Sequence, residues 1–138
     1  YVLENKNAEL ISLQEERAFL NRYSYLLKIR YEKAVSFTVN VEEKYLNRYL
    51  PPMCLQMLVE NTIQHNEASQ ANPLRVDIYT KEDTLIIENN IQLRSDRAES
   101  TKTGLNNIQS RYAYYADKKV EISDNGEVFR VTLPLMTI

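Results

Sequence analysis

The stretch LVENTIQHN, from Leu58 to Asn66, alternates apolar and hydrogen-bonding side chains at the spacing of one short helix. The residues of one face are three or four positions apart: Met57, Glu60, Asn61, Gln64 and His65. The opposite face is mainly apolar: Leu55, Leu58, Val59, Thr62 and Ile63. This pattern predicts a helix that packs one side on a core and presents a polar ridge to a ligand.

The residues before this stretch predict where the helix begins. Pro51 and Pro52 suit a first helical turn, because the N–H group that proline lacks would have no partner there. The helix is therefore expected over 51–67. A polar face is more often only the solvated side of a helix, so the function depends on the rest of the chain.

Composition narrows the class of protein. The 138 residues suit one domain, and 17 basic against 19 acidic residues leave a net charge of −2, which offers no basic field for nucleic acid. Cys54, the one cysteine, excludes an internal disulfide and is expected to be buried in a reducing compartment. Transmembrane and signal-peptide patterns are absent. Only two glycines occur, so P-loop and Rossmann phosphate cradles are excluded. The first residue, Tyr1, indicates a fragment of a longer protein.

The remaining periodicities predict an α+β chain. Helical spacing covers 8–33 and continues from Leu105 toward Tyr115, and alternation predicts strands at 35–41, 74–79, 84–89, 119–123 and 127–135. Glu82-Asp83 is a predicted turn, and Asp124-Asn125-Gly126 is interpreted as a type I′ hairpin turn rather than a nucleotide motif. The order of elements predicts a two-layer sandwich, with helices on one face of a mixed, mostly antiparallel sheet.

Three segments could form one binding site. The first is the polar ridge at 60–66, the second is Glu88-Asn89-Asn90 at a strand end, and the third, 100–105, opens a helix. Gly104, expected in the first turn, would leave backbone N–H groups open to a phosphate, and Lys102 could add charge. A plain helix cap formed by Ser100, Thr101 or Thr103 is the simpler alternative.

The side-chain chemistry of these segments suits a nucleotide. The amide oxygen of Asn61 could bind Mg²⁺, which takes its other ligands from waters and phosphates. His65, one turn later, could donate to a phosphate oxygen. Asn89 or Asn90 could pair with the edge of a base.

The runs YLPPMCLQMLVENTIQHN, LIIENN, STKTGLNNIQSRY and VTLPL occur in this order. Together they resemble the catalytic ATP-binding domain of LytS-type sensor histidine kinases, a branch of the Bergerat-fold ATPases, over roughly residues 12–136. The resemblance implies binding of ATP and Mg²⁺ and phosphorylation of a histidine, which passes the phosphoryl group to an aspartate of a response regulator. The phosphoacceptor segment of the family has no counterpart here, so that histidine is expected upstream.

The resemblance also implies roles for individual residues. Asn61 matches the Mg²⁺ ligand, and Glu60, the acidic residue before it, is the candidate catalytic carboxylate. The implied ATP-binding residues are Asn61, Gln64, His65, Asn89, Lys102, Thr103, Gly104 and Leu105. Residues 91–103 would be the lid over ATP.

The implied organisation has two parts. Residues 1–34 resemble the end of the dimerisation hairpin, and 35–138 form the ATP-binding domain of a homodimeric, cytoplasmic kinase module that is anchored in the membrane upstream. The sequence departs from the family at Asn89-Asn90-Ile91, where Asp-x-Gly-x-Gly is usual, and at Lys102, which replaces a glycine. A second hypothesis follows from these departures, namely a scaffold that binds a partner kinase or regulator without turning over ATP.

Overall fold

The computed structural model describes residues 10–92, 100–114 and 119–137, without the side chains of residues 100–104. Its centre is a five-stranded sheet in the order β2-β4-β5-β7-β6. The strands are β2 (Val35–Asn40), β4 (Leu74–Lys81), β5 (Thr84–Asn90), β6 (Glu121–Asp124) and β7 (Val128–Pro134). Only the β2–β4 pair is parallel among these neighbours.

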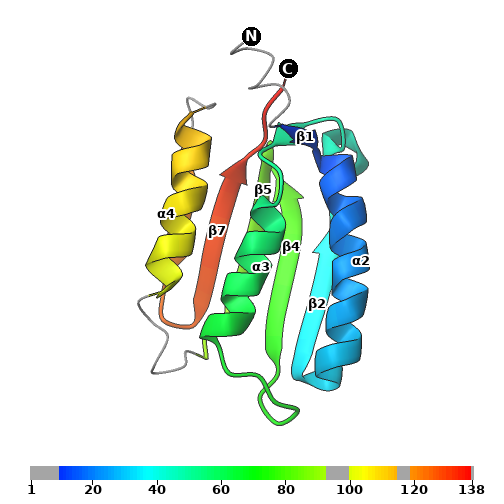
Figure 1. The fold of residues 1–138 in the computed structure, drawn as a ribbon, viewed down its shortest axis with the longest axis vertical. Coiled ribbons are helices and arrows are strands. Elements are labelled where there is room, and N and C mark those ends of the chain that lie inside the picture. Colours follow the sequence, from blue (N-terminus) through cyan, green and yellow to red (C-terminus); the bar gives the residue numbers. More distant parts are fainter. Residues whose placement is uncertain (1–9, 93–99, 115–118, 138) are drawn as a thin grey trace.

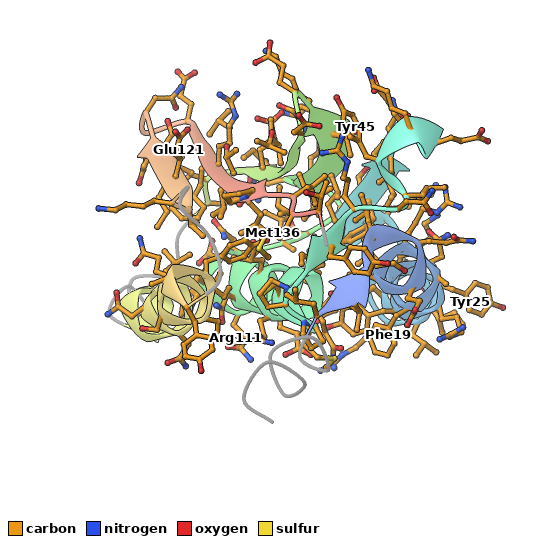
Figure 2. All side chains as sticks on the ribbon, turned by 90° about the horizontal axis from the view of Figure 1, so that it is seen from above. Phe19, Tyr25, Tyr45, Arg111, Glu121 and Met136 are labelled. Atoms are coloured by element: carbon orange, nitrogen blue, oxygen red, sulfur yellow. The ribbon has the colours of Figure 1, made fainter. Side chains whose placement is uncertain are left out.

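Three helices cover one face of this sheet: α2 (Leu13–Tyr31), α3 (Cys54–His65) and α4 (Ser100–Ala113). Figure 1 shows them side by side in front of the strands, and the view from above in Figure 2 shows helices on one side and the sheet on the other. The predicted α+β two-layer sandwich is confirmed. None of the helices within the described ranges combines the length and hydropathy needed to cross a membrane.

The core lies between the two layers, and β4 shows the alternation of buried and exposed residues most clearly. Along β4, Leu74, Val76 and Ile78 are buried, whereas Arg75 between them is exposed. The central strands β5 and β7 continue this pattern, and α3 adds Leu55, Leu58 and Val59 from the helix side. The apolar face predicted for α3 is therefore confirmed.

The first helix is shorter than the predicted 8–33. Ser12 caps its start by accepting from the backbone N–H of Glu15 at 3.2 Å, and Ile11–Ser12 forms strand β1, which pairs with β3 (Tyr49–Leu50). At the other end Glu32 has a φ of 51°, and a 3₁₀ turn, η1 (Glu32–Ala34), leads into β2. A second turn of this kind, η2, covers Glu43–Tyr45. Residues 8 and 9 lie outside the described part of the chain.

The two hairpin connections of the main sheet have a different backbone conformation from each other. Glu82 and Asp83, which join β4 to β5, both have positive φ (49° and 62°), as the two central residues of a type I′ turn require. In the β6–β7 connection only Gly126 has positive φ, so the type I′ prediction for Asp124-Asn125-Gly126 is wrong. There the Asn125 Oδ1 accepts from the N–H groups of Glu127 (2.9 Å) and Val128 (2.8 Å), and this side-chain cap replaces the tight turn.

Candidate functional site

The three segments singled out in the sequence converge at one end of the molecule. Because α3 and α4 run in opposite directions, the last turn of α3 and the first turn of α4 lie at the same end, where β5 also finishes (Figure 1). At the other end of the two helices Arg111 of α4 donates to the carbonyl of Pro52 at 2.6 Å. The helices are thus fastened together at the end away from the candidate site.

The start of α3 is not where the prolines indicated. The helix begins at Cys54, after Met53 in a left-handed conformation (φ 70°), so Pro51 and Pro52 precede the first turn. Its first N–H groups are satisfied by Glu16 of α2, whose carboxylate accepts from Met53 at 3.4 Å and Leu55 at 3.3 Å. Glu16 is 3% exposed, and this burial raises the pKa of its carboxyl above 4.5.

Asn61 lies on the half-buried side of α3. Its Nδ2 atom is buried and has no hydrogen-bond partner among the residues that the structure describes. A buried amide is costly without a partner, and such an atom is expected where a ligand completes the bonding. Rotating the amide would expose its oxygen to the same space, which is the atom a hard cation needs.

Glu60, the candidate catalytic carboxylate, lies beside Gln56 of its own helix and Tyr23 of α2. Its Oε1 atom accepts from Gln56 Nε2 at 2.9 Å, and its charge acts on the nearby Tyr23 of α2. Burial, followed by the nearby Glu60 charge, raises the pKa of Tyr23 to about 12. The structure therefore places Glu60 at the α2–α3 contact, and its catalytic role stays a prediction.

The other two polar residues of the ridge, Gln64 and His65, differ in exposure. Gln64 is exposed, whereas His65 is buried at 3% exposure. The predicted ridge does not present both side chains to solvent, because His65, at the last position of α3, turns into the protein. Contact between His65 and a phosphate stays a prediction.

At the end of β5 the two asparagines point to opposite faces. Asn89 is buried on the helix side, and its Nδ2 donates to the carbonyl of Asn90 at 2.8 Å, which orients the Oδ1 atom as the acceptor. Asn90 is bound to the neighbouring chain segment instead, since it accepts from the N–H of Arg75 and donates to the carbonyl of Pro73. Of the two candidates, Asn89 is the one placed beside the helices.

Helix α4 begins earlier than expected. It starts at Ser100, so its free N–H groups belong to residues 100–103, and Gly104 lies beyond the first four positions. The free N–H groups that were predicted near Gly104 therefore belong to the turn before it, residues 100–103. Leu105 is half-buried beside the core. The side chains of Lys102 and Thr103, and residues 93–99 of the predicted lid, are outside what the structure describes.

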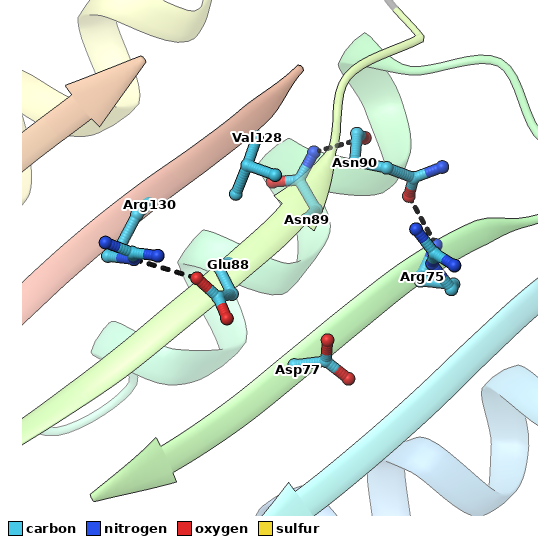
Figure 3. A pocket seen from close by; sticks show the side chains of 7 residues that line it. All are labelled: Arg75, Asp77, Glu88, Asn89, Asn90, Val128 and Arg130. Atoms are coloured by element: carbon cyan, nitrogen blue, oxygen red, sulfur yellow. Dashed lines mark hydrogen bonds and ion pairs between the residues drawn. The ribbon is translucent and has the colours of Figure 1, made fainter. Parts of the chain in front are cut away.

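A hollow of about 290 Å³ lies on the opposite face of the sheet (Figure 3). Most of its lining comes from outward-facing positions of β4, β5 and β7, and Arg130 Nε pairs with Glu88 Oε2 there at 2.8 Å. Arg75, Asp77, Asn89, Asn90 and Val128 complete the lining. This hollow is separated from α3 and α4 by the sheet and is not the predicted ATP site.

No individual role was predicted from the sequence for Glu16, Asn66 and Gln92. Glu16 carried a signal, because it is a charged residue within the apolar spacing Leu13–Leu20–Leu27 of an amphipathic helix. For Asn66 and Gln92 the sequence offered no such signal, because the hydrogen bond between them joins residues that are 26 positions apart. In the described ranges no group of three or more His, Cys, Asp and Glu side chains could hold a metal ion.

Comparison with known proteins agrees with this arrangement. The chain is 28% identical over 153 residues to the sensor histidine kinase/phosphatase LytS of Staphylococcus aureus (strain MRSA252); this match covers 96% of the chain and 26% of LytS. The chain thus spans about a quarter of the length of the curated relatives that it matches. No model of a protein family matches the chain.

Solved structures show the same fold at low sequence identity. The cytoplasmic segment of histidine kinase QseC aligns with a TM-score of 0.62 at 14% identity, over 94% of this chain and 76% of that one. The catalytic domain of histidine kinase ThkA aligns with a TM-score of 0.57 at 15% identity, over 93% and 99%. The predicted Bergerat-type sandwich is confirmed by these alignments. In sequence the chain is thus similar to sensor histidine kinases of the LytS type, and in fold it is similar to the catalytic domains of histidine kinases.

Proposed function

We propose that this domain binds Mg-ATP between α3, the end of β5 and the start of α4. It presents the terminal phosphate to a histidine of the longer protein, outside this chain. The buried Asn61 Nδ2, which has no partner in the described ranges, is the observation that best supports this site. The relationship to the kinase/phosphatase LytS supports phosphoryl transfer as the reaction.

Each group has a limited task, because phosphoryl transfer relies on positioning and on neutralisation of charge. Asn61 would orient the cation and its phosphates, and Asn89 Oδ1 would accept a hydrogen bond from the amino group of adenine. The N–H groups at the start of α4 would hold a phosphate oxygen. Bound Mg²⁺ would supply the positive charge that offsets the charge of the phosphates.

The partners follow from the same proposal. The phosphoacceptor histidine would belong to the same longer protein, which would act as a homodimer on the cytoplasmic side of the membrane. An aspartate of a response regulator would receive the phosphoryl group. The chain alone is expected to bind nucleotide without phosphorylating itself.

Calorimetric titration with Mg-ADP tests the role of Asn61. Asn61→Ala is expected to weaken binding at least about tenfold, which corresponds to about 1.4 kcal/mol. Asn21→Ala is the matched control, because Asn21 is exposed on α2 and belongs to none of the three segments of the proposed site. Equal, measurable binding by all three proteins would exclude Asn61 from the site.

The second candidate function is a scaffold that binds a partner kinase or regulator without turning over ATP. It is favoured by Ile91 and Lys102, which stand where the related kinases carry glycines. The N–H of Ile91 is bound to the carbonyl of Glu127 at 2.9 Å. The two functions differ in whether a nucleotide stabilises the folded domain.

A further inference from the structure

The two halves of the proposed nucleotide site stand on different elements. Asn61 belongs to α3, whereas Asn89 belongs to β5, and the sequence between them includes the whole of β4. A ligand that bridges both residues gains affinity only if their separation is fixed before it binds. Some contact must therefore hold the end of β5 against the end of α3.

Asn66 and Gln92 make that contact through their backbone and side chains. The N–H of Gln92 donates to Asn66 Oδ1 at 2.8 Å, and the Gln92 carbonyl accepts from the N–H of Glu67 at 2.8 Å. The Gln92 Nε2 donates to the carbonyls of Glu67 (2.7 Å) and Asn72 (3.0 Å). Gln92, two residues after β5, is thus bound to the segment that leaves α3.

Asn66 connects this segment to the helix itself. Its Nδ2 donates at 2.8 Å to the carbonyl of Thr62, which is one of the last-turn carbonyls that lack a partner within a helix. Thr62 neighbours Asn61 in the sequence, and Asn66 is only 4% exposed. A single buried amide therefore joins the turn that carries Asn61 to the strand extension that follows Asn89.

We infer that Asn66 and Gln92 are positioning residues of the nucleotide site, which fix the distance between the Asn61 and Asn89 half-sites. We call these two side chains and their hydrogen bonds the α3–β5 latch. The inference rests on the proposed function. It predicts that loosening the latch weakens a ligand that spans both half-sites more than a ligand that uses one.

The experiment compares Asn66→Ala and Gln92→Ala with the unaltered chain. Asn66→Ala removes the bonds to Thr62 and to the Gln92 N–H, whereas Gln92→Ala removes only the two side-chain bonds, so the effect should be smaller. Ser69→Ala is the control, because Ser69 Oγ accepts from the Asn72 N–H in the same connection, and none of the hydrogen bonds described above for Asn66 and Gln92 involves Ser69. Calorimetry measures Mg-ADP and adenosine, and amide hydrogen exchange is followed without ligand.

For Asn66→Ala, Mg-ADP affinity should fall at least about tenfold, and adenosine affinity should change by less than about threefold. The amides of Glu67 and Gln92 should exchange at least about tenfold faster, while amides in the core of β7 keep their rates. If the affinities for Mg-ADP and adenosine fall by the same factor, the latch has only a structural role and the inference is wrong. Unchanged Mg-ADP binding together with faster exchange would also overturn the inference.

The outcomes separate the two proposals. If Asn61→Ala loses Mg-ADP binding and the latch variants keep it, only the latch inference fails. If the unaltered chain binds neither ligand, the proposed function fails and the positioning role fails with it, whatever the exchange rates show. Should Asn66→Ala not fold, Gln92→Ala provides the same comparison with a smaller perturbation.

Discussion

At the level of single residues, Glu16 is a charged side chain in an unusual place, because it is 3% exposed. It lies among the leucines of α2 and satisfies the first N–H groups of α3, while Arg111 of α4 contributes a nearby positive charge. Its carboxylate thus links all three helices. The raised pKa indicates that desolvation outweighs these favourable contacts.

The stability of the chain should therefore depend on the protonation of Glu16. The folded chain binds this proton more readily than the unfolded chain, so the stabilisation is complete below pH 4.5 and is lost as pH rises through the folded pKa. Glu16→Gln cannot titrate. The free energy of unfolding of the unaltered chain, relative to this variant, is expected to fall between about pH 4 and about pH 8.

Urea unfolding at both pH values measures this difference. Glu15→Gln, an exposed neighbour on the same helix, accounts for the loss of one negative charge from α2. If the free energy of unfolding of the unaltered chain instead rises with pH relative to that of Glu16→Gln, the assignment is wrong.

At the level of elements, α2 is an integral part of the sandwich. Leu13, Leu20 and Leu27 lie in the same core cluster as the strands. The outward side carries exposed apolar residues as well, and Figure 2 shows Phe19 and Tyr25 on the side of α2 away from the sheet. Whether residues 1–34 also continue a dimerisation hairpin in a longer protein stays a prediction.

Two leucines on α2 provide a direct test of this packing. Leu20 is 1% exposed and Leu26 is 61% exposed. Leu20→Ala is expected to lower the free energy of unfolding by about 2–5 kcal/mol, because it leaves a cavity in the core. Leu26→Ala should change it by less than about 0.5 kcal/mol. Equal effects in urea unfolding would show that α2 does not pack on the sheet as described.

At the level of the whole molecule, the sheet divides two environments. The helix side holds the core and the candidate nucleotide site, whereas the outer side carries charged rows such as Glu88 and Arg130. Antiparallel packing of α3 and α4 brings the two helix ends and β5 together at one end of the molecule (Figure 1). A ligand at that end would touch three elements and stabilise the whole fold.

Thermal unfolding tests this expectation and separates kinase from scaffold. Mg-ADP at about 100 times its Kd should stabilise the folded chain by about 2.7 kcal/mol. For a domain of this size the rise in Tm would be about 8 °C. Mg-GDP, whose base has a carbonyl in place of the adenine amino group, should shift Tm less because Asn89 Oδ1 can only accept. No shift with Mg-ADP would favour the scaffold.

The sequence alone determined the features that depend on local periodicity. Alternation located every strand of the main sheet to within two residues, and helical spacing identified the buried face of α3. The order of the motifs also led to the resemblance to LytS-type kinases, because motif order can be compared without knowing side-chain geometry. These features depend on residues that are close in the sequence, because the spacing of apolar residues determines which side of a helix or strand is apolar.

Only the tertiary structure decided which polar side chains face which neighbours. His65 is buried, Glu60 turns toward Tyr23, and Asn66 reaches Gln92, although all three lie in or next to the same helix. Helical spacing gives each residue a face, but the elements that pack against that face come from distant parts of the sequence. A hydrogen bond across 26 residues, such as that between Asn66 and Gln92, leaves no local pattern, because its geometry exists only once the sheet and helices have assembled.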